Sequence, residues 1–180
     1  PGSVTLIAPD AFANCSALTS VTIPSSVTSI EPYSFYECSG LKSVTIPSSV
    51  TSIGRYSFYR CLGLETISIP SEVMSIGDAA FYECSGATSE LVLPNSVRSI
   101  GRNAFNGCSG LTGDLTIPSG ITSIEYFSFA NCSGLTGTLT IPSGVTSIED
   151  GAFSGCSGLT GTLTIPSGVN IIGNWVFWEC

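Results

Sequence analysis

The chain has 180 residues, of which 43% are hydrophobic, and this is enough to bury the core of one ordinary domain. Only 10% of the residues are charged, and 5 Lys and Arg stand against 13 Asp and Glu, so the formal net charge is −8. This acidic balance argues against nucleic acid and anionic membrane surfaces as partners, because both bind clustered cations. No run approaches the roughly 20 apolar residues that span a bilayer, so direct membrane insertion is not expected.

The dominant signal is an internal repeat of 23 to 24 residues that recurs from one end of the chain to the other. Each Pro-to-Cys step is 14 residues, whereas the Cys-to-Pro step grows from 9 to 10 from the fourth cysteine onward. A phenylalanine precedes every cysteine by three residues. We therefore interpret residues 1–180 as one array of between seven and eight coils, with partial repeats at both ends and no second domain.

Each unit begins with an expected short strand. In the segment SVTIP, Val44 and Ile46 point to one side while Ser43 and Thr45 point to the other, which is the period of two that a strand requires. Pro47 ends this strand, because a proline cannot donate to the next rung of a sheet. The strand is therefore predicted to bury one face.

The apolar pattern continues around the rest of the coil through Val50, Ile53, Phe58, Cys61 and Leu64. The FxxCxxL spacing of three is typical of a turn, a 3₁₀ turn or a short helix. One coil cannot bury its own apolar face, so the coils are expected to stack, with strands about 4.8 Å apart around a continuous core.

The unit LKSVTIPSSVTSIGRYSFYRC, residues 41–61, resembles the BspA-like class of leucine-rich repeats. The resemblance covers essentially the whole chain. It implies a right-handed leucine-rich-repeat solenoid with a strand plus a turn, 3₁₀ turn or short helix in each coil. It also implies a surface or secreted protein, because proteins of this class are typically displayed by bacteria and some parasitic protists, and several are linked to adhesion. The chain departs from the commoner leucine-rich pattern at Ser49, where a ladder Asn or Cys is expected.

The phenylalanine and cysteine columns are expected to form the structural core ladder. Adjacent cysteines would have their Cβ atoms one strand spacing apart, beyond the usual distance of about 3.5–4.5 Å in a disulfide. Thiolates in a straight column cannot converge on zinc. Buried free thiols are the leading prediction, with some disulfides as an alternative, and neither a metal nor a cofactor is expected. The ladder comprises Phe35, Cys38, Phe58, Cys61, Phe81, Cys84, Phe105, Cys108, Phe129, Cys132, Phe153 and Cys156.

No catalytic site is expected. Histidine is absent, which removes the commonest general base and metal ligand. Serines and threonines are plentiful but repeat with the coil and lack an activating base. No carboxylate pair forms a motif distinct from the repeat.

The candidate binding residues are five tyrosines next to the phenylalanine column. Tyr33 and Tyr56 lie two places before it, and Tyr36, Tyr59 and Tyr82 directly follow it. An exposed aromatic stripe favours contact with a protein or a glycan. The alternative is that the rings cover the turn and pack on one another.

Charged and hydroxyl side chains fill further columns. Charges of alternating sign suggest ion pairs between coils, each contributing less than about 1 kcal/mol. The two charged columns are Glu37, Arg60 and Glu83, and Arg55, Asp78 and Arg102. The outward strand positions form two ranks of mostly Ser and Thr, from Ser20 to Thr162 and from Thr22 to Thr164, interrupted by Glu90, Val92 and Asp114.

The leading hypothesis is a non-catalytic binding or adhesion module, extracellular or on the cell surface, that presents its repeat surface to a protein or glycan ligand. The alternative is a fibre or coat subunit that self-associates head to tail through uncapped solenoid ends. A lesser alternative is ice binding through the Ser and Thr ranks, although Thr is also simply a good strand residue.

Overall fold

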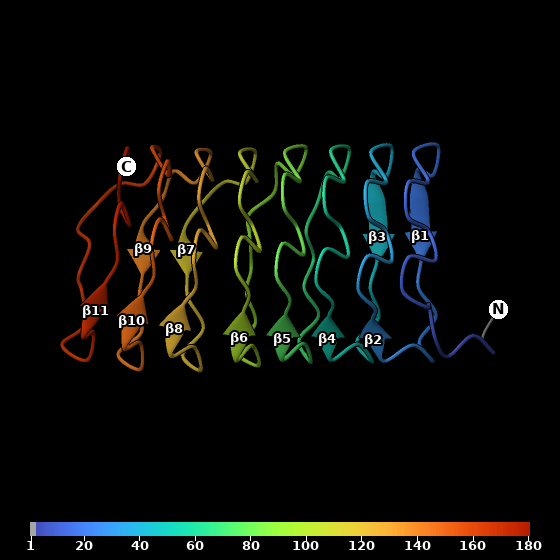
Figure 1. Cartoon of the computed structure of the whole chain (residues 1–180), viewed down its shortest axis with the longest axis horizontal. Coiled ribbons are helices and arrows are strands. Elements are labelled where there is room, and N and C mark those ends of the chain that lie inside the picture. Colours follow the sequence, from blue (N-terminus) through green and yellow to red (C-terminus); the bar gives the residue numbers. More distant parts are fainter. Residues whose placement is uncertain (1–2) are drawn as a thin grey trace.

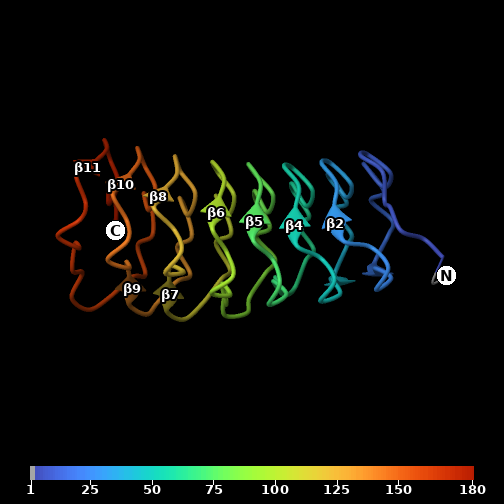
Figure 2. The ribbon, with the colours of Figure 1, turned by 90° about the horizontal axis from the view of Figure 1, so that it is seen from below.

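A computed structural model describes residues 3–180 as one stack of coils that follow one another in sequence order along the long axis (Figure 1). The predicted solenoid of 23- to 24-residue coils is confirmed. The described residues contain no helix, and consecutive turns take the place of the short helix or 3₁₀ turn that the FxxCxxL spacing left open. The view from below shows the same order of coils (Figure 2).

The predicted strand after each cysteine forms regular pairs in four of the coils. Parallel pairing joins Ser20 to Ser43 and Leu115 to Leu139, so equivalent residues of neighbouring coils lie side by side. The Ser and Thr side chains of these strands are exposed and the apolar ones turn inward, as the alternation predicts. The strands are β1 (Ser20–Thr22), β3 (Ser43–Thr45), β7 (Leu115–Thr116) and β9 (Leu139–Thr140).

A second strand of two residues recurs in seven coils and was not predicted. Its Ile is buried in every coil but the last. Two residues are too few to show an alternating pattern in the sequence, so only the pairing between coils reveals this strand. The strands are β2 (Ser29–Ile30), β4 (Ser52–Ile53), β5 (Ser75–Ile76), β6 (Ser99–Ile100), β8 (Ser123–Ile124), β10 (Ser147–Ile148) and β11 (Ile171–Ile172).

The second row of strands is divided into the sheets β2-β4-β5-β6 and β8-β10-β11. Glycine follows β5 and β6, where the coils come very close: a Cβ on Gly77 or Gly101 would lie 2.5 Å from a backbone nitrogen of the preceding coil. Glu125 occupies this position after β8, where the pairing with β6 stops. A Cβ at this position does not by itself prevent pairing, because Glu149 follows β10, which pairs with β8.

The core is a continuous stack of phenylalanine rings that runs through eight coils, from Phe12 to Phe177. Neighbouring ring centroids are 5.2–5.7 Å apart and the ring planes agree within 9°. The rings between the two ends are buried. Such offset stacking is a favourable arrangement for aromatic pairs, so each coil is held to the next by the same contact.

The cysteines line this stack as free thiols. From Cys38 onward, each thiol donates to the carbonyl oxygen of the phenylalanine in the preceding coil, with S···O distances of 3.0–3.2 Å. Six cysteines are buried, and Cys15 and Cys180 are exposed. Burial raises the pKa of Cys61 and of Cys156 to about 12, because a thiolate loses its hydration there. These thiols thus serve as neutral hydrogen-bond donors between coils.

Candidate binding surface

The backbone of each turn holds the tyrosines in line. Tyr33 and Glu37, on either side of Phe35, adopt positive φ angles of 58° and 53°. This conformation turns alternate N–H groups toward the next coil, where those of Tyr33, Phe35 and Glu37 donate to backbone carbonyls at 2.8–3.0 Å. Because every coil repeats this turn, side chains at equivalent positions stand directly beside one another.

The five predicted tyrosines come together in two stacked columns, here called the tyrosine ladder. The rings of Tyr33 and Tyr56 are 5.0 Å apart, and those of Tyr36, Tyr59 and Tyr82 follow at 4.9 and 4.8 Å, with planes within 9°. Tilted contacts of 5.7 and 5.5 Å join the two columns. All five side chains are half-buried. Stacking covers both faces of Tyr59 and one face of each other ring, so the ring edges and hydroxyls are most of what the ladder offers to solvent.

A column in which acidic and basic side chains alternate, Glu37, Arg60 and Glu83, directly follows the second tyrosine column in the sequence. Arg60 Nε lies 3.0 Å from Glu83 Oε2, and Arg60 Nη1 lies 3.8 Å from Glu37 Oε1, so the predicted ion pairs of this column are confirmed. Burial raises the pKa of Tyr36 and Tyr82, and the carboxylates of Glu37 and Glu83 raise it further. The phenols therefore remain protonated and able to donate at neutral pH.

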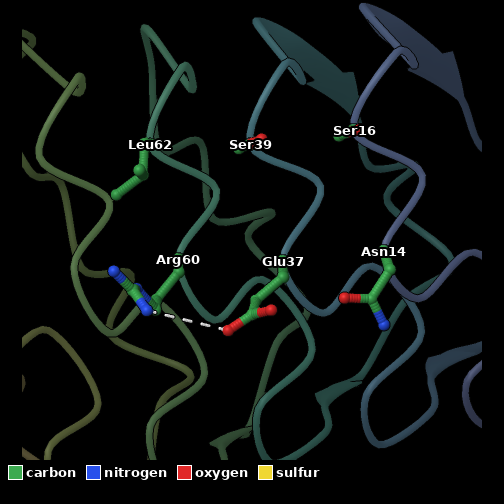
Figure 3. Close-up of a pocket in the computed structure, with 6 residues that line it drawn as sticks. All are labelled: Asn14, Ser16, Glu37, Ser39, Arg60 and Leu62. Carbon is green, nitrogen blue, oxygen red and sulfur yellow. Dashed lines mark ion pairs between the residues drawn. The ribbon is translucent and has the colours of Figure 1, made fainter.

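An open hollow lies against this column over the first three coils (Figure 3). Asn14, Glu37 and Arg60 form one row, in which the Glu37 and Arg60 side chains point toward each other. Ser16, Ser39 and Leu62 form a second row beside it. The hollow therefore combines an amide, a carboxylate and a guanidinium, and Glu37 and Arg60 directly follow Tyr36 and Tyr59 in the sequence.

The ion pairs predicted for the second charged column are wrong. Asp78 Oδ1 accepts the backbone N–H of Arg102 at 2.8 Å instead of pairing with a guanidinium. The Arg102 guanidinium lies 3.9 Å from Glu125 and the Arg55 guanidinium lies over the Tyr33 ring at 5.7 Å. The physical reason is that this corner exposes an N–H of the next coil within reach of the shorter Asp side chain.

Serine hydroxyls form contacts between coils that the sequence did not reveal. Ser49 Oγ donates to Val27 O and Ser96 Oγ donates to Val73 O, each at 2.6 Å. The departure from the commoner leucine-rich pattern at Ser49 thus has a structural role, because this hydroxyl satisfies a carbonyl of the preceding coil. The repeated Ser before Val was the available signal.

The Ser and Thr ranks lie on the first strands and not on the tyrosine ladder. Both ranks are exposed from Ser20 to Thr164, including the interrupting Glu90, Val92 and Asp114. Asp114 Oδ1 accepts from the backbone N–H and the hydroxyl of Thr138, and these bonds lower the pKa of the Asp114 carboxyl.

Within residues 3–180, no three His, Cys, Asp or Glu side chains gather closely enough to hold a metal ion. The described part of the chain also has no helix long and apolar enough to cross a membrane.

The comparisons with known proteins agree with the repeat. A model of the BspA type leucine rich repeat region matches residues 5–136 and 85–180. The chain is similar to a leucine-rich repeat protein from Bacteroides ovatus, with 30% identity, a TM-score of 0.83 and coverage of 93% of this chain but 43% of that one. It is also similar to the leucine-rich repeat protein TpLRR of T. pallidum, with 32% identity, a TM-score of 0.78 and coverage of 86% and 71%.

More distant likenesses concern the fold alone. The pneumococcal vaccine antigen PcpA is 24% identical with a TM-score of 0.51, and the match covers 86% of this chain and 36% of that one. No curated protein matches the chain. The chain thus spans less than half the length of the Bacteroides ovatus protein.

Proposed function

The chain belongs to the BspA type leucine-rich repeat family, and from this premise we propose that it is a non-catalytic binding module displayed outside the cell. The extracellular or cell-surface location follows from the resemblance to this class of repeat proteins. In the proposed role, the solenoid is a rigid support and one of its faces contacts a ligand.

The tyrosine ladder is the observation that carries the proposal. Tyrosine and arginine are among the residues that most often dominate the energy of protein interfaces. Here Arg60 directly follows Tyr59 and pairs with Glu83, which directly follows Tyr82. Half-burial and stacking already fix the rings, so the tyrosine side chains would lose little conformational entropy when a ligand binds.

The same geometry favours a protein over a glycan as the ligand. A sugar ring binds an aromatic side chain through its open face, whereas the ladder rings cover one another at 4.8–5.0 Å. The phenol edges, the hydroxyls and the Glu37–Arg60–Glu83 column instead match the mixed polar and apolar surface of a protein.

Binding to purified extracellular proteins and to a glycan array tests this proposal. Tyr59→Ala should weaken the binding of a protein ligand at least tenfold, because hot-spot tyrosines contribute about 2 kcal/mol or more. The variant should fold, since Ala13 and Ala130 occupy the same column. Thr140→Ala on the strand face is the matched control and should bind normally. Equal binding by both variants, or binding to glycans alone, would contradict the proposal.

Head-to-tail assembly is a second candidate. Ile171 and Ile172 of β11 are 55% and 52% exposed, and an apolar edge strand pairs readily with another strand. Further coils of a longer chain would cover the same residues. Sedimentation at high concentration tests assembly, and a strictly monomeric species would count against it.

A further inference from the structure

A second aromatic site lies at the other end of the face that carries the tyrosine ladder. Phe127, Ser154, Trp175 and Trp178 line an open hollow, here called the tryptophan hollow. Phe127 and Trp175 occupy the column of Tyr33, and Ser154 and Trp178 occupy the column of Tyr36. The hollow is therefore made from the same two columns as the ladder, four coils further along.

Small residues in the seventh coil create the hollow. Gly151 stands between Phe127 and Trp175, and the Phe127 ring lies so close over it that a Cβ would collide with the ring. Ser154 stands before Trp178 and supplies the one polar side chain of the lining. The aromatic columns are thus interrupted for one coil, and the interruption leaves a recess between rings.

The rings on either side of the hollow have no aromatic neighbour in the seventh coil, unlike the stacked tyrosines of the ladder. Trp175 is 66% exposed and Trp178 is 57% exposed. With a single hydroxyl in its lining, the hollow has few hydrogen-bond partners for a sugar. The rest of its lining is aromatic, and aromatic rings attract a cation through their negative faces.

The charge distribution points to the same kind of ligand. All five Lys and Arg residues lie between Lys42 and Arg102, so residues 103–180 carry no cationic side chain. The same stretch carries five carboxylates, at Asp114, Glu125, Glu149, Asp150 and Glu179. The hollow is therefore an aromatic site in a part of the chain where carboxylates are in excess, one of which, Glu125, pairs with Arg102.

The chain itself shows how a cation is accommodated on such rings. The Arg102 guanidinium lies 4.8 Å from the centre of the Tyr126 ring, next to Phe127, and Arg55 lies 5.7 Å from that of Tyr33. Both cations are guanidinium groups, which are planar and stack on aromatic faces better than ammonium groups. The tryptophans have no arginine of this kind in their part of the array.

We propose that the tryptophan hollow binds an arginine side chain from a basic segment of a partner protein. The guanidinium stacks on the indole rings, and the net negative charge of residues 103–180 attracts the positive segment. This site differs from the tyrosine ladder in position and in chemistry, so it does not depend on the function proposed for the ladder.

The two tryptophans of the hollow are the only ones in the chain, so intrinsic tryptophan fluorescence reports on this site alone. A short arginine-containing peptide should produce a saturable change in emission. The same peptide with citrulline in place of arginine keeps the shape and removes the charge, and it should bind at least tenfold more weakly. Binding of the arginine peptide should also weaken as salt rises, because the attraction is electrostatic.

Two variants test the residues. Trp175→Ala and Trp178→Ala each leave one fluorescent reporter and place in each column a residue that the array already holds there, at Ala79 and Ala130. Each should lower the affinity by about two- to fivefold, as expected for loss of an exposed cation–π contact. Tyr59→Ala should leave the affinity unchanged, which separates this site from the ladder.

Three results would overturn the proposal. One is equal binding of the arginine and citrulline peptides, and another is unchanged affinity in both tryptophan variants. The third is the absence of a saturable signal up to a peptide concentration on the order of 10 mM.

Discussion

Replacing Phe105 with alanine tests whether the phenylalanine stack couples the coils. Phe105 is fully buried, and its ring lies 5.4 Å from both Phe81 and Phe129. Truncation of a buried phenylalanine lowers the free energy of unfolding by roughly 3–5 kcal/mol, because it removes apolar burial and leaves a cavity. We expect a loss in the upper part of this range, since the flanking rings hold the cavity open from both sides.

Phe12→Ala is the matched control at the end of the stack. Phe12 is 36% exposed and stacks on one ring, that of Phe35, at 5.2 Å. Its truncation removes less buried area and leaves a site open to solvent, so we expect a loss of about 1–2 kcal/mol.

Unfolding in guanidinium chloride, followed with two probes, measures the loss of stability in both variants. Far-UV circular dichroism follows the whole array, whereas fluorescence of Trp175 and Trp178 follows its last coil. In a solenoid each coil contacts only its neighbours, so a central defect should separate the two transitions. If Phe105→Ala destabilises the chain no more than Phe12→Ala does, the stack does not couple the coils.

Three further predictions follow from the contacts between coils. In the native chain at pH 8 a thiol reagent should modify Cys15 and Cys180 quickly, and all eight cysteines should react only after denaturation. Rapid modification of more than two cysteines in the native chain would contradict the burial of the other six. The free energy of unfolding should fall between about pH 9 and pH 12, because the pKa of Cys61 is about 12 in the folded chain and the thiol loses its proton at lower pH when the chain is unfolded. The contribution of the protonated thiol to stability is therefore lost as the pH rises through about 12. An unchanged denaturation midpoint across that window would refute this. Ser49→Ala should lower the free energy of unfolding by about 1 kcal/mol, because it removes the hydrogen bond to Val27 O. Ser48→Ala is the control and should leave the free energy of unfolding nearly unchanged, because the Ser48 side chain is exposed. Equal losses in the two variants would contradict the role assigned to Ser49.

The proposed site could be predicted in part. The positions of the five tyrosines followed from their phase relative to phenylalanine, but their stacking did not, because the distance between coils and the turn conformation decide whether rings face each other. The tryptophan hollow was missed for a similar reason: Gly151 and Ser154 look like ordinary substitutions in a repeat until the rings on either side are placed.

The array, its period and its inward face follow from the amino-acid sequence alone, because columns in fixed phase can share one environment only if the coils stack. Period-two alternation was sufficient for the first strand. The contacts between coils became evident only in the folded chain. They are the second strand, the hydrogen bonds of the thiols and serines, and the hydrogen bond from the Arg102 N–H to Asp78. These contacts join residues 22 to 27 positions apart, and their partners depend on fractions of an ångström in how one coil rests on the next.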